Sequence, residues 1–484
     1  MKNRSQKHQW IHKQIAFFLF SNLLICGCTH SEAWRRHRPQ AALMTAVPAL
    51  PKFHDTQLSN GLTVLTTPLP TLPIVHVQVT LKVGSAQDPT GQEGTAYLMG
   101  QMLRESTSQH SSINLAKAFG DLGSQVNVQV SQDAIHLWVG VLQHHADKAV
   151  QLLAQMLQQP AFSQKDFVRV RTKHLASLQH NQAKAPYTAM ATFWQEAYGQ
   201  QHPYGHSIYG NVDSVKKLQR AHVVQMWQSY VGSQSTALLL SGHVSPQKAQ
   251  QLAQKHFAQW QNSTGIVVAP PDPPAPEQLA IHVIPRANAP QTFVLLGTPA
   301  LRPGQPNNAA LLVLNEILGG MFTSRLNLKL REEKGWTYGS HATLQTLRGL
   351  GPLLIYANIQ QPHAPAAVTE ILAQLDQLQQ TPPSDKEVQA AKQHLLRSFP
   401  GRFNTVGSMS QHMASLFVRN LPFDYHRQLL ENIASVTPQH IFQVAQETLS
   451  SHQMHAVLVG DPTHLQPESF QLPNAQITVH PPTP

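Results

Sequence analysis

Apolar side chains recur with two different spacings along this chain, and the two spacings predict two kinds of element. Around 75–81 every second side chain is apolar, and 63–65 begins a similar run, which is typical of β-strands. In 146–158 and 364–380 the apolar positions follow helical spacing, which predicts amphipathic helices. Strands and helices mixed in this way indicate an α+β fold.

This pattern occurs twice. Four landmarks of the first part recur in the same order in the second: His145 as His363, Gln155 as Gln374, Phe162 as Pro383 and Gly242 as Gly460. A near-constant separation of about 220 residues between landmarks indicates a duplication. Prolines crowd 268–276 between the two copies. Because proline interrupts helices and central strands, this segment is predicted to be an extended linker.

The N-terminal segment is typical of a secreted protein. A basic stretch precedes an apolar run of about a dozen residues, which is too short to span a bilayer as a stable helix. The run ends at Cys28, which follows the small residue Gly27, so it resembles a bacterial lipobox with Cys28 as the lipidated residue. Thr29 follows, with no aspartate to favour inner-membrane retention, so we expect an outer-membrane lipoprotein facing the periplasm. An ordinary cleaved signal peptide is the alternative.

Together these features divide the chain into six parts. They are a leader over 1–27, a tether over 28–52, a first half over 53–265, a Pro-rich linker over 266–279, a second half over 280–465 and a tail over 466–484. Cys26 and Cys28 are the only cysteines, which excludes a disulfide framework and a cysteine-based zinc site in the mature chain.

Charge and composition narrow the function classes further. The chain is 41% hydrophobic, enough for large cores, and only 12% of its residues are charged. Its net charge of +10 is concentrated in part in the leader, which carries Lys2, Arg4, Lys7 and Lys13 and no acid. No basic stripe with interleaved aromatic residues appears elsewhere, so nucleic-acid binding is not expected.

Several motifs in both halves resemble the insulinase/pitrilysin family. In the first half they are Leu58–Val64, Gly94–Ala96, Met102–Leu103, His202–Gly205 and Gly210. In the second half they are the more specific blocks Leu314–Leu326 and Leu330–Tyr338. The resemblance covers about residues 53–465. It implies two homologous insulinase-like halves, each an antiparallel-rich sheet with helices packed on it, which together form half of a clamshell.

Active members of that family bind zinc through an inverted H-x-x-E-H helix. Two histidines on one helix face bind the metal with a glutamate from a later helix, and the motif glutamate activates the bound water. Aligned on the motif, this chain has Tyr97, Gly100 and Gln101 at the three positions, and Ser177 at the later ligand. Val170 stands at a supporting acidic position. We therefore expect no metal in this chain and zinc in a partner chain.

Other histidines are weak candidates for a metal site. His144 and His145 lie close to Asp147, but they begin a predicted surface helix and are interpreted as structural or solvated. His174 and His180 flank the vacant zinc position and have no acidic neighbour in the sequence.

Arg331 and Tyr338 have the spacing of a pair that active family members place in their C-terminal half. In the family these side chains donate hydrogen bonds to the scissile carbonyl as it becomes an oxyanion. The alternative is that Arg331 caps a helix and Tyr338 packs on a strand. Gly319 and Gly320 occupy the place of a glycine-rich loop that guides substrate in two-chain members, and a helix stop is the alternative.

Two hypotheses follow from the resemblance. The leading one is a non-catalytic subunit of a bacterial envelope zinc peptidase, which binds peptide and lends Arg331 and Tyr338 to a zinc-bearing partner. The second is an inactive pseudopeptidase that binds peptides or acts as a scaffold in the envelope. A peptidase active alone through another metal site is the weakest alternative, because the sequence shows no ligand set for it.

Overall fold

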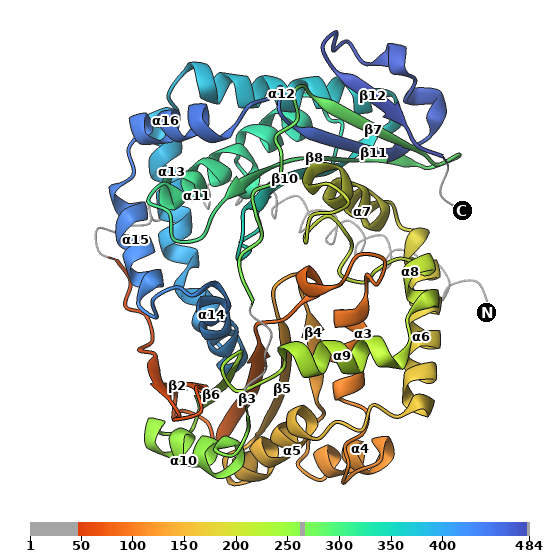
Figure 1. Cartoon of the computed structure of the whole chain (residues 1–484). Coiled ribbons are helices and arrows are strands. Elements are labelled where there is room, and N and C mark those ends of the chain that lie inside the picture. Colours follow the sequence, from red (N-terminus) through yellow and green to blue (C-terminus); the bar gives the residue numbers. More distant parts are fainter. Residues whose placement is uncertain (1–46, 262–266, 482–484) are drawn as a thin grey trace, which may run out of the picture. The chain divides into compact units, whose positions relative to one another are not determined.

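Two six-stranded sheets, one in each half of the chain, form the framework of the protein (Figure 1). The computed structural model describes residues 47–261 and 267–481. These residues belong to one compact unit, Ala46–Pro484. Cys28, the leader and most of the tether lie outside the described residues.

The first sheet has the order β1-β2-β6-β3-β5-β4. Its strands are β1 (His54–Gln57), β2 (Thr63–Pro68), β3 (Ile74–Leu81), β4 (Asn127–Val130), β5 (Ile135–Leu142) and β6 (Thr236–Gly242). All neighbours are antiparallel except β2 and β6, which are parallel. The central strand β6 is buried along its whole length, which explains its continuous apolar run.

The second sheet has the order β12-β7-β11-β8-β10-β9. Its strands are β7 (Ala280–Pro285), β8 (Gln291–Leu301), β9 (Ser340–Leu344), β10 (Gly351–Gln360), β11 (His455–Gly460) and β12 (Gln476–Val479). Five neighbouring strands correspond to the first sheet in order, with β7, β11, β8, β10 and β9 in the places of β2, β6, β3, β5 and β4. The α+β fold and the duplication predicted from sequence are thereby confirmed.

The outer strand beyond this common core differs between the halves. In the first sheet β1 precedes β2 and pairs with it antiparallel. In the second sheet β12 comes from the C-terminal end and pairs parallel with β7. The second half therefore extends past residue 465, and part of the predicted tail completes its sheet. Repetition could not reveal this strand because it has no counterpart in the first half.

Helices cover both faces of each sheet. In the first half they are α3 (Thr95–Leu103), α4 (Ser112–Gly120), α5 (Ala146–Gln158), α6 (Gln164–Gln182), α7 (Ala185–Tyr198), α8 (Val212–Lys217), α9 (Arg220–Tyr230) and α10 (Pro246–Phe257). In the second half they are α11 (Asn308–Asn315), the π-helical turns η3 (Glu316–Gly320) and η4 (Asn327–Glu333), α12 (Ala364–Gln380), α13 (Asp385–Ser398), α14 (Val406–Arg419), α15 (Tyr425–Ser435) and α16 (Pro438–Thr448). The two helices predicted from apolar spacing are α5 and α12, with the predicted bounds.

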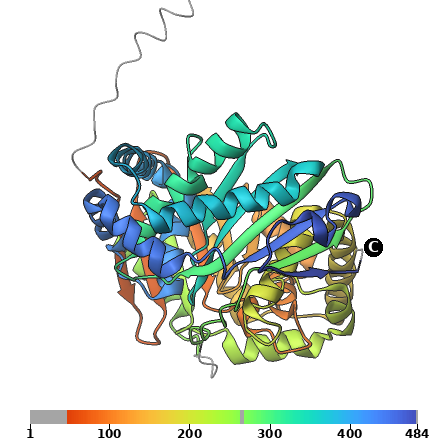
Figure 2. The same cartoon turned by 90° about the horizontal axis from the view of Figure 1, so that it is seen from above.

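The two halves exchange one helix each. Helix α7 of the first half packs on β8 and β11 of the second sheet, where Phe193 and Trp194 meet Leu295 and Val457. Helix α14 of the second half packs on β6 and β3 of the first sheet. From above, α12 lies across the second sheet (Figure 2), and Figure 1 places α7 against its other face.

A buried polar contact also joins the halves. The backbone N–H of Arg348 donates to Asp133 Oδ2 at 2.7 Å, and Arg348 Nη2 donates to the Asp133 carbonyl at 2.9 Å. The hydroxyl of Tyr204 donates to Asp133 Oδ1 at 2.7 Å. All three residues are buried, so each polar group needs its partner, and the contact fixes how the two sheets meet.

The described part of the linker has no regular secondary structure over 267–276, as its prolines predicted. Among the residues that the structure describes, no helix combines the length and apolarity needed to cross a bilayer.

An ion pair holds the motif segment of the second half to α13. Arg325 Nε donates to Glu387 Oε1 at 2.7 Å, and Glu387 also accepts from the hydroxyl and the N–H of Ser384, at 2.7 and 2.9 Å. Burial raises the pKa of Glu387, but the hydrogen bonds from Arg325 and Ser384 outweigh it and leave the pKa at about 2. Arg325 therefore has a structural role.

We predict that Glu387→Gln lowers the free energy of unfolding by about 1 kcal/mol at pH 7, a value reduced for solvent screening. Because the folded pKa lies below the ordinary value of 4.5, the stabilisation is complete above that value and is lost as the pH falls toward 2. Urea unfolding of both proteins at pH 7, 5 and 3 measures the difference. Glu333→Gln, at an exposed pair with Lys329, is the control and should change little. A difference that grows as the pH falls would contradict the assignment.

Candidate functional site

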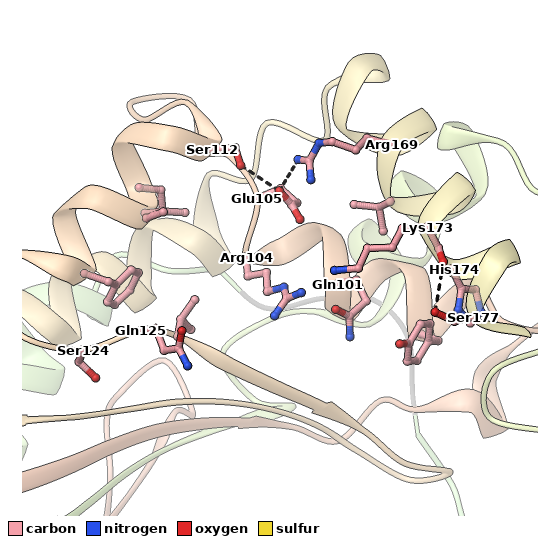
Figure 3. A pocket seen from close by; sticks show the side chains of 16 residues that line it. Gln101, Arg104, Glu105, Ser112, Ser124, Gln125, Arg169, Lys173, His174 and Ser177 are labelled. Atoms are coloured by element: carbon pink, nitrogen blue, oxygen red, sulfur yellow. Dashed lines mark hydrogen bonds and ion pairs between the residues drawn. The ribbon is translucent and has the colours of Figure 1, made fainter. Parts of the chain in front are cut away.

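The structure brings four predicted positions of the degenerate zinc motif around one cavity. Tyr97 and Gln101 project from α3, and Val170 and Ser177 from α6, into a pocket of about 580 Å³ between α3, α4 and α6 (Figure 3). The fifth position, Gly100, does not line this pocket. The positions on α3 and on α6 that the family alignment relates to one zinc site are thus close together in space.

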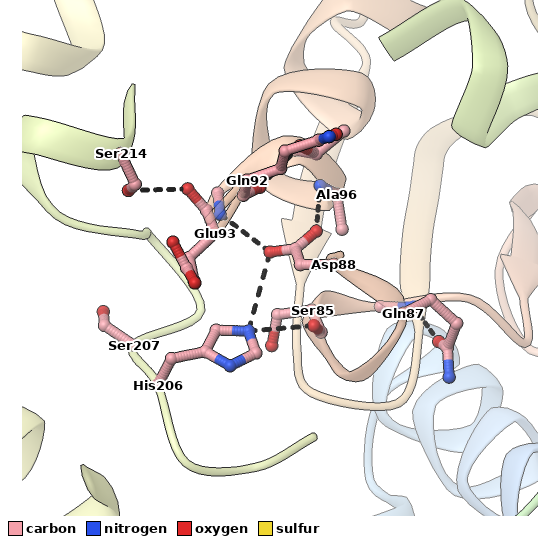
Figure 4. Close-up of polar contacts among 12 residues, drawn as sticks. Ser85, Gln87, Asp88, Gln92, Glu93, Ala96, His206, Ser207 and Ser214 are labelled. Atoms are coloured by element: carbon pink, nitrogen blue, oxygen red, sulfur yellow. Dashed lines mark hydrogen bonds and ion pairs between the residues drawn. The ribbon is translucent and has the colours of Figure 1, made fainter. Parts of the chain in front are cut away.

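Helix α3 is held at its N-terminus by a buried carboxylate. Asp88 Oδ2 accepts from the N–H of Gly94 and Oδ1 from that of Ala96, both at 2.7 Å (Figure 4). These bonds satisfy free amides of the first turn. A negative charge is also stabilising there, because the N-terminus is the positive end of the helix dipole. Gly94 has a φ of +96°, and a Cβ there would meet the Tyr209 carbonyl at 2.9 Å. The Gly94–Ala96 motif therefore determines where α3 begins.

A histidine supports that carboxylate. His206 Nε2 donates to the Ser85 carbonyl at 3.0 Å and lies 3.7 Å from Asp88 Oδ2 (Figure 4). Burial raises the pKa of Asp88 despite its hydrogen bonds. Burial lowers the pKa of His206, but the neighbouring Asp88 outweighs it and the pKa is raised. The pair is a structural brace for α3, because neither side chain lines the pocket.

Gly100 packs against the edge strand β4 instead of the cavity. A Cβ at this position would lie 2.7 Å from Val130 Cγ2 and 3.4 Å from Val128 Cγ1. Valine side chains are stiff, so the strand would have to move to admit any side chain. At the position of the catalytic glutamate in active family members, the space for a side chain is therefore occupied here by the valines of β4.

The residues around the pocket do not form a zinc ligand set. Gln101 offers an amide, Tyr97 a phenol and Ser177 a hydroxyl that donates to the Lys173 carbonyl at 3.2 Å. His174 Nε2 donates to the Tyr209 carbonyl at 2.8 Å, which leaves the lone pair of Nδ1 buried without a partner in the described residues. One imidazole is not enough, because zinc sites use at least three nitrogen, sulfur or carboxylate ligands. Zinc therefore does not fit this pocket.

Two cations give the pocket its chemical character. Arg104 and Lys173 line it, and within the described residues neither forms an ion pair (Figure 3). The one pocket carboxylate, Glu105, is already bound by Arg169 and accepts from Ser112 Oγ at 2.9 Å. The unpaired charge is therefore positive, and the pocket suits an anionic group such as a carboxylate. Neither cation was predicted from sequence, because the resemblance directs attention on these helices to metal ligands only.

Arg331 and Tyr338 lie outside this pocket. Tyr338 is 93% exposed and lines a different cavity, together with Met190 of α7 and Tyr356 of β10. The Arg331 guanidinium lies 4.3 Å from the ring centroid of Phe322, which is itself 67% exposed. Arg331 is partly exposed, and its Nε also lies 3.5 Å from Glu332 Oε1 in an ion pair at the surface. Tyr338 is almost fully exposed and can reach a bound partner. Their catalytic role stays a prediction.

Gly319 and Gly320 lie at the end of η3. A Cβ on Gly319 would meet the Ala342 backbone nitrogen at 2.7 Å, so this glycine permits η3 to approach β9. Gly320 is the last residue of η3 and is exposed. Gly319 is thus explained by a close contact and Gly320 by the end of the helix. A contact of either glycine with substrate stays a prediction.

The histidines considered as metal ligands from the sequence either contact other side chains or are exposed to solvent. His144 and His145 contact each other with ring centroids 4.0 Å apart. Asp147 is bound by His256 and Lys255, both at 2.6 Å, and these hydrogen bonds lower the pKa of its carboxyl. His180 is exposed on α6. We therefore find no metal site at these residues.

Comparison with known families shows the family to which this chain belongs. A sequence profile described as "Insulinase (Peptidase family M16)" matches residues 63–211, and one described as "Peptidase M16 inactive domain" matches residues 217–395. The two matches together cover more than half of the chain. The chain belongs to the insulinase family.

Curated relatives carry names of two kinds. An "Uncharacterized zinc protease" of Rickettsia felis is 21% identical over 84% of this chain and 97% of its own length. A "Non-peptidase homolog" of Helicobacter pylori is 23% identical over 76% of this chain and 85% of its own length. The names of these relatives thus include both a protease and a non-peptidase, so family membership alone does not show whether a chain is catalytic.

Solved structures agree on the fold. A peptidase M16 inactive domain from Pseudomonas fluorescens has a TM-score of 0.78 at 21% identity, covering 85% of this chain and 98% of that one. A chain of complex III2 from Candida albicans has a TM-score of 0.74 at 14% identity, covering 85% and 97%. The two insulinase-like halves predicted from sequence are confirmed.

We predict that Gly100→Glu, which restores the catalytic residue type of the family, destabilises the protein by about 2 kcal/mol or more, because it overpacks Val130 and buries a carboxylate. Thermal or urea unfolding measures the loss. Gly120→Glu is the matched control, since a Cβ there meets nothing within 4 Å, and it should change stability by about 0.5 kcal/mol at most. Equal losses in the two variants would show that packing at Gly100 is not the constraint.

Proposed function

We propose that this chain is the non-catalytic subunit of a bacterial envelope peptidase of the insulinase family. In this proposal a separate zinc-bearing chain pairs with it as the other half of a clamshell, and peptide substrate is held between them. The observation that carries the proposal is the contrast between its two sites. The residues around α3 and α6 offer no zinc ligand set, while Tyr338 is almost fully exposed and Arg331 lies at the surface in an ion pair with Glu332.

The surroundings of Arg331 and Tyr338 support a contact with a partner. Phe322 and Leu328 are exposed apolar side chains, 67% and 51% respectively, on the segments that carry Arg331. Exposed apolar groups beside a cation are typical of the centre of an interface. The names of relatives agree with a non-catalytic member, since one is called a non-peptidase homolog and one structure an inactive domain.

The chemistry expected of the pair is stabilisation of negative charge. A guanidinium stays protonated at all physiological pH values, and a phenol donates one hydrogen bond. Directed at a scissile carbonyl in the partner's site, these donors would lower the barrier as that oxygen becomes an oxyanion. The location is part of the proposal: a periplasmic protein anchored to the outer membrane through Cys28.

The first experiment is capture of the tagged mature chain from its native envelope, followed by mass spectrometry. We expect a stoichiometric relative that carries H-x-x-E-H. Recovery of this chain alone, or with unrelated envelope proteins, would overturn the subunit proposal.

In the reconstituted complex, Arg331→Ala combined with Tyr338→Phe should lower kcat/KM for peptide hydrolysis about 100-fold or more, since one oxyanion donor is worth about that factor. The control pair is Arg427→Ala with Tyr425→Phe on α15, which should leave the rate near that of the unaltered complex. Full activity of the Arg331/Tyr338 variant would refute a role for the pair.

One observation favours a second candidate function, a peptide-binding protein without catalysis. The cationic pocket lies beside β4, an edge strand that has an unpaired side in the described structure. An extended peptide could pair with such an edge through its main chain while an acidic side chain enters the pocket. This candidate needs no partner and no metal.

A fluorescent peptide with a central glutamate tests this candidate, because Arg104→Ala should weaken its binding about tenfold, the value of a charged hydrogen bond. The same peptide with glutamine should bind the unaltered chain correspondingly less well. Lys117→Ala, an exposed cation on α4 outside the pocket, is the control. Equal binding by the Arg104 and Lys117 variants would exclude the pocket as the peptide site.

A further inference from the structure

Three histidines lie on one face of the second sheet, on or next to three adjacent strands. His282 on β7 pairs in register with Val457 of β11 and Thr478 of β12. His455 and His480 each lie two residues from those partners, so the alternation of a strand points all three imidazoles to the same face. The N–H of His480 donates to the Val283 carbonyl at 2.8 Å, which fixes this residue beyond the end of β12.

Helix α7 of the first half lies on that same face and adds a carboxylate. Ile284 and Val457, on the histidine face, contact Phe193 and Trp194 of α7. Glu196 follows in the last turn of α7. Its carboxylate and the ring nitrogens of His282 and His480 all lie within 4.8 Å of one another. Within the described residues Glu196 forms no ion pair, and its Oε1 accepts an exposed hydrogen bond from Gln195 Nε2 at 3.5 Å.

The hydrogen-bonding nitrogens of the histidines follow a definite order. His282 Nδ1 lies 3.2 Å from His480 Nε2, and His282 Nε2 lies 3.5 Å from His455 Nδ1. If His282 Nε2 carries the proton and donates it to His455, the lone pair of Nδ1 points at His480. This is how a second histidine fixes the tautomer of a metal ligand.

We propose that Glu196, His282 and His480 bind one divalent transition-metal ion of the zinc type, with His455 as the positioning residue. Two imidazoles and a carboxylate are an established ligand set for such ions. Metal–nitrogen bonds of about 2.0–2.1 Å place two nitrogens of a tetrahedral site roughly 3.3 Å apart. The observed separation of 3.2 Å is close to that value, whereas Glu196 must rotate to complete the site.

Two of the three histidines are buried. His282 and His455 are 6% and 7% exposed, and burial lowers the pKa of each to about 4. For His282 the neighbouring His455 and His480 lower it further.

The ion would have a structural effect. Its ligands come from α7 of the first half, from β7 of the second sheet and from the residue that follows β12, so it would link three segments that are distant in sequence. Strand β12 needs such a link, because it pairs on one side only, with β7. This site is separate from the α3/α6 pocket and does not depend on the proposed function.

The test uses the protein without an affinity tag and Co²⁺ as the probe, whose visible absorbance reports a protein site of low coordination number. We expect one equivalent to bind and to be displaced by Zn²⁺. Glu196→Gln and His480→Ala, which change partly exposed side chains, should each weaken Co²⁺ binding at least tenfold. Zn²⁺ should raise the Tm of the unaltered protein and leave that of His480→Ala unchanged.

The control is a variant with both His144 and His145 changed to alanine, which removes the surface histidine pair on the other sheet. It should bind Co²⁺ as the unaltered protein does. The proposal is overturned if the unaltered protein binds no more Co²⁺ than His480→Ala. It is equally overturned if binding is lost in the His144/His145 variant. In the first case the three rings form only a buried chain of hydrogen bonds.

Discussion

The exchange of α7 and α14 between the halves is the interaction on which the rest of the structure depends. Each sheet has one face that its own half leaves uncovered, and burial of that face requires the helix of the other half. Phe193 and Trp194 on α7 supply large apolar surfaces to the second sheet, at about 25 cal/mol for each Å² removed from water. Neither half can therefore bury its full core alone, and the two sheets form one compact unit.

This exchange also places every candidate site. Helix α7 follows directly after α6, which forms one wall of the cationic pocket, and its Met190 reaches the cavity of Tyr338. Its last turn brings Glu196 to the histidines of the second sheet. The polar contact of Asp133 with Arg348 and Tyr204 also joins the two halves. The His202–Gly205 motif, read as a family feature, thus acts in the joint between the halves through Tyr204.

The architecture was accessible from sequence where the pattern is local or repeated. Period-two runs and helical spacing predicted β3, α5 and α12, and the repeat predicted two similar halves. Strand β12 and the helix exchange were not accessible, because nothing in a residue's own segment shows which sheet it will cover. The same reason hid Glu196, His282 and His480, which are brought together only by the exchange and by the parallel pairing of β7 with both β11 and β12.

The degenerate zinc position was predicted by alignment with the zinc motif of the family that the sequence resembles, and the structure adds why one of its changes is difficult to reverse. At Gly100 the missing glutamate is replaced by contact with Val130, so the change is part of the packing of β4 on α3. Tyr338 is the opposite case. At 93% exposure its hydroxyl contributes almost nothing to the folding free energy, so packing cannot explain its presence. Removing that hydroxyl should leave stability unchanged, and any effect must therefore arise from a contact that this chain makes with another molecule.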